Sequence, residues 1–165
     1  MKKLAEFIST LFYFGNSPVA PGTIGSLAAL ILIFPLVWVP SILLCFFATA
    51  LATVLGLIFI PFYLQGKTDD FQEIVIDEAA GLYLTILLAM IASKLLQIKP
   101  NYYIVFILCF VLFRLFDITK PSVIGYFDRT LKGAVGIMMD DLIAAIFSGV
   151  SMGTMLLIYK YCYTQ

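Results

Sequence analysis

The 165-residue chain carries ten basic and ten acidic side chains and no histidine, and 62% of its residues are hydrophobic. This composition is too apolar for an ordinary soluble domain of the same size, so the chain is predicted to be an integral membrane protein. The balanced charge offers no basic surface for nucleic acid, and the lack of histidine removes the commonest general base, metal ligand and phosphorylated nucleophile.

The N-terminal segment is predicted to form an amphipathic helix that lies in the membrane interface. Its apolar side chains recur at helical spacing, namely Leu4, Phe7, Ile8, Leu11 and Phe12. A signal peptide is the competing interpretation, but Glu6, Ser9 and Thr10 interrupt the apolar run that a signal peptide needs. A polar face opposite an apolar face is typical of a helix on a bilayer surface.

Apolar segments bounded by proline or by charged clusters follow along the chain. About five membrane spans are predicted from them, near Ile24–Val39, Ser41–Leu64, Ala79–Ile98, Tyr102–Phe116 and Leu142–Tyr161. A bilayer core needs about 20 apolar helical residues, so the first and fourth spans are short. Short connections and the lack of internal repeats predict one all-α, antiparallel helical bundle, a single domain over residues 1–165.

The charged residues are distributed unevenly between the two membrane faces that these spans define. The polar stretches 15–23, 65–78 and 117–141 fall on the side of the N-terminus, together with every Asp and Glu of the sequence. Most basic residues lie there too, whereas Lys94, Lys99 and Lys160 fall on the opposite face. The positive-inside rule therefore places the acidic side in the cytoplasm.

The stretch DDFQEIVIDEAAG, residues 69–81, holds five of the ten acidic residues. A helix N-terminus explains Asp69 and Asp70 well, because acids there complement the helix dipole. Asp77 and Glu78 instead follow three apolar residues and adjoin a span, and ionisable groups at membrane depth tend to be functional. If the preceding segment is helical, Glu73 shares a face with Asp77.

Three further motifs could carry chemistry. In RLFDITKP, residues 114–121, Arg114, Asp117 and Lys120 step by three, either as a functional face or as a salt bridge at a helix end. In GAVGIMMDD, residues 133–141, Asp140 and Asp141 open the last span as a second acidic pair that adjoins an apolar run. In PGTIGS, residues 21–26, Thr23 can cap a helix whose N-terminus attracts phosphate.

Taken together, these groups favour phosphate chemistry on a membrane-embedded substrate. Carboxylates hold hard divalent cations such as Mg²⁺, which also binds substrate phosphate oxygens. Arg114 and Lys120 could neutralise phosphate charge. A metal ion in such a site activates water or stabilises the leaving oxygen.

The same motifs identify the chain as similar to the phosphatidylglycerophosphatase A family. The resemblance rests on SPVAPGTIGSL (17–27), EIVIDEAAG (73–81), FRLFDITKP (113–121) and FDR (127–129) through GAVGIMMDD (133–141), in the order and spacing of the family. It implies a Mg²⁺-dependent phosphatase of the bacterial inner membrane with a cytoplasmic-facing site. Its implied reaction converts phosphatidylglycerophosphate into phosphatidylglycerol and inorganic phosphate.

The resemblance also implies roles for individual residues. The metal-binding or catalytic carboxylates would be Asp77, Glu78, Asp140 and Asp141, with Asp117 and Asp128 as further candidates, and the phosphate contacts would be Thr23, Arg114 and Lys120. Which carboxylate acts as base and which as ligand stays open at this point.

Other chemistries fit the sequence less well. Only four residues separate Cys109 from Arg114, so the phosphate-binding loop of thiol phosphatases is not formed, and metal-activated water is favoured over a covalent intermediate. A CDP-alcohol phosphotransferase-like enzyme is a nearer alternative, but Ala144 stands where a further Asp is needed. An acid-lined ion transporter is the remaining alternative, although the acids lie at helix ends on one side.

Overall fold

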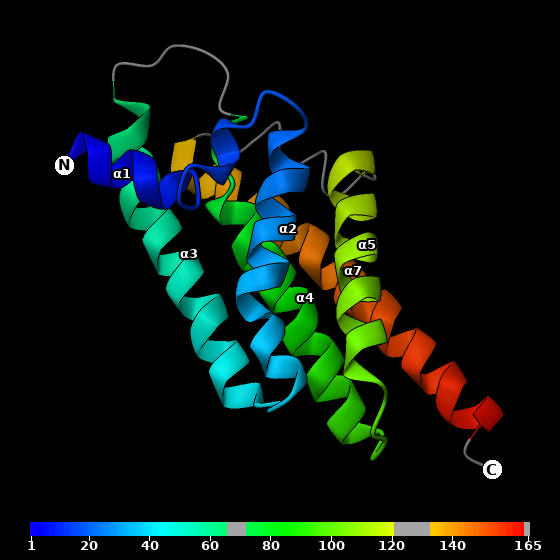
Figure 1. Ribbon diagram of the computed structural model, residues 1–165. Coiled ribbons are helices and arrows are strands. Elements are labelled where there is room, and N and C mark those ends of the chain that lie inside the picture. Colours follow the sequence, from blue (N-terminus) through cyan, green and yellow to red (C-terminus); the bar gives the residue numbers. More distant parts are fainter. Residues whose placement is uncertain (66–71, 121–132, 164–165) are drawn as a thin grey trace.

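In the computed structural model, residues 1–65, 72–120 and 133–163 are described (Figure 1). Their regular structure consists of α-helices and short 3₁₀ turns, without a strand, which confirms the all-α prediction. The elements are α1 (Lys2–Ser9), η1 (Phe14–Asn16), α2 (Pro21–Ile33), η2 (Phe34–Val37), α3 (Ile42–Leu64), α4 (Ile76–Leu95), α5 (Tyr102–Thr119) and α7 (Gly133–Tyr163).

Among the described residues, four helices are long and apolar enough to cross a bilayer, namely α3, α4, α5 and α7. The first predicted span is present as a shorter apolar unit, Pro21–Val37, in which α2 continues into η2. The α-helix tightens there into a 3₁₀ turn because Pro35 has no backbone N–H to continue the ladder. The predicted number of spans is therefore close to the observed one.

The helices run alternately up and down, as short connections require (Figure 1). At one end of the bundle, Ser41 accepts a hydrogen bond from the backbone N–H of Leu44 at 3.3 Å and caps α3. Asn101 caps α5 in the same way through the N–H of Tyr103, at 3.0 Å. These caps satisfy backbone donors that the helices leave unpaired at their first turns.

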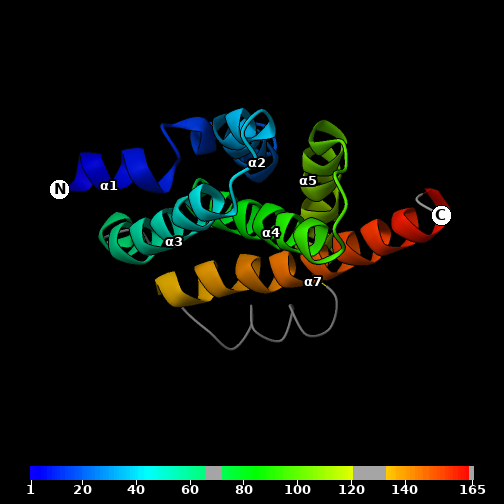
Figure 2. The same ribbon diagram turned by 90° about the horizontal axis from the view of Figure 1, so that it is seen from below.

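Helix α4 forms the centre of the bundle and contacts α2, α3, α5 and α7 (Figure 2). Small residues make this close packing possible. A Cβ atom at Gly81 would lie 2.5 Å from Cε2 of Phe113 on α5 and 3.0 Å from the backbone oxygen of Asp141 on α7. Close approach at small residues is how membrane helices gain packing energy without a hydrophobic driving force.

Helices α4 and α7 begin earlier than predicted. Helix α4 starts at Ile76 rather than Ala79, and α7 at Gly133 rather than Leu142. The prediction used the acidic pairs as span boundaries, but both pairs are buried inside helices. Consequently Asp140 and Asp141 lie about two turns inside α7.

The N-terminal amphipathic helix is present but shorter than predicted. Leu11 and Phe12 have positive φ angles of 46° and 60°, so the chain turns after Ser9 instead of continuing the helix. The carbonyl of Ser9 accepts a hydrogen bond of 2.9 Å from the N–H of Val75, directly before α4. Helix α1 thus fixes the entry to the central helix.

Gly81→Ala is expected to lower stability by about 1–3 kcal/mol, because its methyl group would push α5 and α7 away from α4. The matched control is Gly153→Ala, whose Cβ would lie 3.6 Å from Cβ of Ala92, an ordinary contact. Thermal unfolding of both variants in detergent measures the difference. Equal midpoints for the two variants would contradict the packing argument.

Candidate active site

The two predicted acidic pairs meet at the end of the bundle where α4 and α7 begin. Ligand oxygens of Asp77, Glu78 and Asp141 all lie within 4.8 Å of one another. All three residues are at most 9% exposed. Residues more than 60 positions apart in the sequence are therefore brought into one buried cluster.

A second group of carboxylates adjoins the first. Asp117, Asp140 and Asp141 also have oxygens within 4.8 Å of one another. Because Asp141 belongs to both groups, the acids of α4, α5 and α7 form one continuous cluster.

The buried cluster has the donor chemistry of a divalent cation site. Within the described parts of the chain, Oδ1 of Asp77, Oε2 of Glu78 and Oδ2 of Asp141 are buried without a hydrogen-bond partner. Burying an unpaired carboxylate is costly, and neighbouring carboxylates repel one another. An all-oxygen donor set is what Mg²⁺ and Ca²⁺ prefer, so the residues fit the expected metal.

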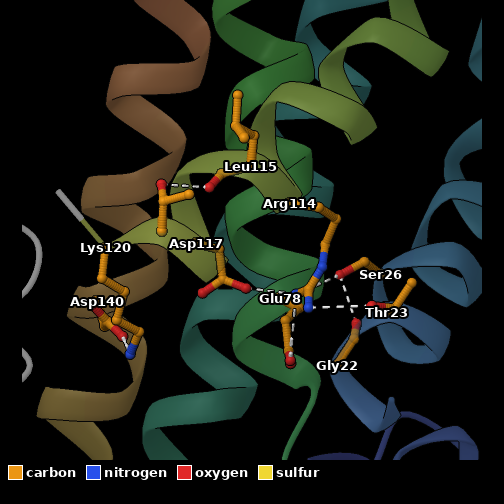
Figure 3. Close-up of polar contacts among 10 residues, drawn as sticks. Gly22, Thr23, Ser26, Glu78, Arg114, Leu115, Asp117, Lys120 and Asp140 are labelled. Atoms are coloured by element: carbon orange, nitrogen blue, oxygen red, sulfur yellow. Dashed lines mark hydrogen bonds and ion pairs between the residues drawn. The ribbon is translucent and has the colours of Figure 1, made fainter. Parts of the chain in front are cut away.

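Arg114 joins three helices at the wall of this cluster (Figure 3). Its Nη1 lies 2.6 Å from Oδ2 of Asp117 and 3.9 Å from Oε1 of Glu78. On the other side, Nη1 donates to Oγ of Ser26 and Nη2 to Oγ1 of Thr23, both at 3.4 Å. The planar guanidinium is thus held in one orientation by two carboxylates and two neutral hydroxyl groups.

Gly22 allows the first turn of α2 to approach these charges. A Cβ atom at this position would collide with Oε1 of Glu78 and lie 3.2 Å and 3.3 Å from the two terminal nitrogens of Arg114. The Oγ of Ser26 donates to the carbonyl of Gly22 at 2.8 Å, which holds the same turn. The start of α2 therefore lies directly against the acidic cluster.

Lys120 does not lie on the helical face that its spacing from Arg114 and Asp117 predicts. Arg114 and Asp117 pair along α5 as their spacing predicts, but Lys120 is the C-cap residue with φ 39°, a left-handed conformation. This turn directs its ammonium group to the carboxylate of Asp140 on α7 (Figure 3). Lys120 thus bridges two helices instead of extending the charged face of one.

A cleft of about 460 Å³ opens over the cluster. It is lined by every predicted site residue that the structure describes, namely Thr23, Asp77, Glu78, Arg114, Asp117, Lys120, Asp140 and Asp141. Asp128 lies outside the described residues. Sequence reasoning missed Gln72, Ile118 and Ile137, which also line the cleft. Helical spacing from Arg114 and Asp141 would have found the two isoleucines.

Glu73 does not share a helical face with Asp77, contrary to one expectation. Residues 74 and 75 are not helical, and α4 starts only at Ile76. The carboxylate of Glu73 accepts a hydrogen bond from the hydroxyl of Tyr63 at the end of α3. This contact links the residues just before α4 to the end of α3. Glu73 is not among the residues that line the cleft.

Comparison with known proteins shows which family the chain is similar to. Residues 7–156 match the family described as Phosphatidylglycerophosphatase A. The chain is 35% identical over 140 residues to Phosphatidylglycerophosphatase A of Escherichia coli (strain K12), covering 81% of this chain and 73% of that protein. It is 40% identical over 135 residues to the Haemophilus influenzae protein of the same name, covering 78% and 74%. The chain belongs to the phosphatidylglycerophosphatase A family.

Family membership makes the protein an enzyme, a phosphatase, and favours it over the phosphotransferase and transporter alternatives. A Bacteroides thetaiotaomicron protein, named as a candidate phosphatidylinositol-3-phosphatase, is 33% identical over 156 residues, covering 88% of this chain and 89% of that protein. No solved structure matches the chain.

Arg114→Lys is expected to lower phosphatase activity by about 10-fold or more, because one ammonium group cannot reproduce the contacts of the guanidinium fork. The measurement is kcat/KM for phosphate release in detergent micelles. Lys94→Arg, on the opposite face of the membrane, is the matched exchange outside the cleft. If Arg114→Lys retains wild-type kcat/KM, Arg114 serves only as a positive charge.

Proposed function

We propose that this protein hydrolyses phosphatidylglycerophosphate to phosphatidylglycerol and inorganic phosphate with the help of Mg²⁺. The observation that carries the proposal is the convergence of Asp77, Glu78 and Asp141 beside Arg114 in one cleft of a membrane-spanning bundle. The family and the names of two relatives support the same substrate.

The cationic and hydroxyl groups would bind the phosphate. Arg114 already lies against Thr23 and Ser26 at the start of α2, so a phosphate in the cleft would meet a guanidinium fork and a helix N-terminus together. Lys120, at the other wall, offers a second positive charge over the same cavity. Arg114 is held in advance by Asp117, so binding need not order a long side chain.

The carboxylates would bind the metal ion and accept a proton from the attacking water. Asp77, Glu78 and Asp141 have the unpartnered oxygens and would be the Mg²⁺ ligands. When bound, Mg²⁺ supplies positive charge for the phosphoryl oxygens and for an attacking water. In the proposed reaction the water oxygen forms a bond to phosphorus while the ester P–O bond breaks. A carboxylate of the cluster accepts a proton from the water, and the departing glycerol oxygen takes up a proton to give the alcohol of phosphatidylglycerol.

We further place the cleft at the cytoplasmic surface of a bacterial inner membrane. Every described Asp and Glu lies at the end of the bundle that carries the cleft, whereas Lys94, Lys99 and Lys160 lie at the other end. The majority of basic residues accompany the acids, which is the pattern of a cytoplasmic face.

Purified protein in detergent is expected to release inorganic phosphate from phosphatidylglycerophosphate when Mg²⁺ is present and to stop when EDTA is added. Phosphatidylinositol 3-phosphate with the same acyl chains is the comparison substrate, because one relative is named for that activity. Turnover that persists in EDTA would remove the metal from the mechanism. Faster hydrolysis of the inositol lipid would replace the proposed substrate.

Asp77→Asn and Asp141→Asn are each expected to lower kcat by about 10²-fold or more, the scale of losing one group that stabilises charge in the transition state. Both variants should fold, because asparagine keeps the shape of the side chain. Glu6→Gln is the matched control, an acid on the same side of the membrane but outside the cleft. Near-wild-type rates for both cleft variants would contradict a catalytic or metal-binding role for these acids.

A further inference from the structure

An apolar groove lies at the end of the bundle opposite the cleft, between the start of α5 and the last turns of α7. Its volume is about 270 Å³. Val105, Met152 and Leu156 form a buried floor, and the exposed side chains of Ile104 and Met155 form the rims. Figures 1 and 2 show that the C-terminal part of α7 extends past the other helices.

A polar pocket lies beside the groove at the end of the bundle. This second pocket, about 370 Å³, is lined by Gln97, Lys99 and Lys160 among others. Tyr159 lines both cavities, so they are neighbours. An apolar groove beside a pocket with two lysines matches the two parts of a phospholipid, an acyl chain and a charged head group.

The side chains around the pocket mark it as the level of the lipid head groups. Trp38, Tyr103 and Tyr161 are exposed at this end of the bundle, as in the aromatic belts of membrane proteins. From Tyr159 to Met152 the groove follows α7 for about 10 Å toward the membrane centre, a path suited to the first part of an acyl chain.

We propose that the groove and the pocket bind one anionic phospholipid from the leaflet opposite the catalytic cleft. Its acyl chain would lie along Val105 and Met152, and its phosphate would meet Lys99 and Lys160. The charge pattern selects an anionic lipid, because the charged side chains among the described residues that line the pocket, Lys99 and Lys160, are both basic. A zwitterionic head group would bring its own cation to the two lysines.

The test is native mass spectrometry of the full-length protein titrated with phosphatidylserine or phosphatidylcholine of identical acyl chains. Wild-type protein is expected to bind phosphatidylserine about 30-fold more tightly than phosphatidylcholine, as two basic residues near the surface would give. Lys99→Gln with Lys160→Gln should abolish this preference. Met155→Trp, which fills the groove, should weaken binding of both lipids severalfold.

Lys94→Gln is the matched control, because Lys94 is an exposed lysine at the same end but outside both cavities. Asp77→Asn in the cleft should leave the preference unchanged and so separates this site from the catalytic one. Equal affinity for the two lipids, or a preference that survives loss of both lysines, overturns the proposal. It is also overturned if Met155→Trp alters the oligomeric state without altering lipid binding, since the groove would then be a contact between copies.

Discussion

The structure depends on the burial of several carboxylates at one end of an otherwise apolar bundle. Moving like charges out of water has a desolvation penalty, and apolar packing between membrane helices does not offset it. Arg114 offsets part of this cost through Asp117 and Glu78, and Lys120 does so through Asp140. The remaining unpartnered oxygens of Asp77, Glu78 and Asp141 are the groups that the proposed cation would stabilise.

The rest of the fold serves to bring these charges together. The central position of α4 places its first turn within reach of α2, α5 and α7. Glycine at positions 22 and 81 removes the side chains that would hold the neighbouring helices apart. The hydrogen bond from Val75 to Ser9 fixes the start of α4 from outside the bundle, so that a surface helix sets the position of two acids in the core.

Much of this arrangement could be predicted from the sequence because membrane chemistry makes ionisable residues conspicuous. Asp77, Glu78, Asp140 and Asp141 stand out against apolar neighbours, and the spacing of Arg114 and Asp117 fixes their common face. Helix boundaries were less accessible, since an acidic pair can either end a span or lie inside it when another helix supplies a partner. The position of the Lys120 side chain depends on a left-handed helix cap, and that of Glu73 on a tyrosine of another helix. Local sequence spacing encodes neither contact.

The length of α7 has a consequence for the membrane around the enzyme. Its 31 residues extend for about 46 Å, well beyond a hydrocarbon core of about 30 Å. A helix longer than the core fits the bilayer by tilting, and Figure 2 shows that α7 crosses the bundle obliquely. The tilt of a membrane helix changes with bilayer thickness, and Asp140 and Asp141 belong to α7. The depth of the carboxylate cluster below the head groups is therefore coupled to the acyl-chain length of the host lipids.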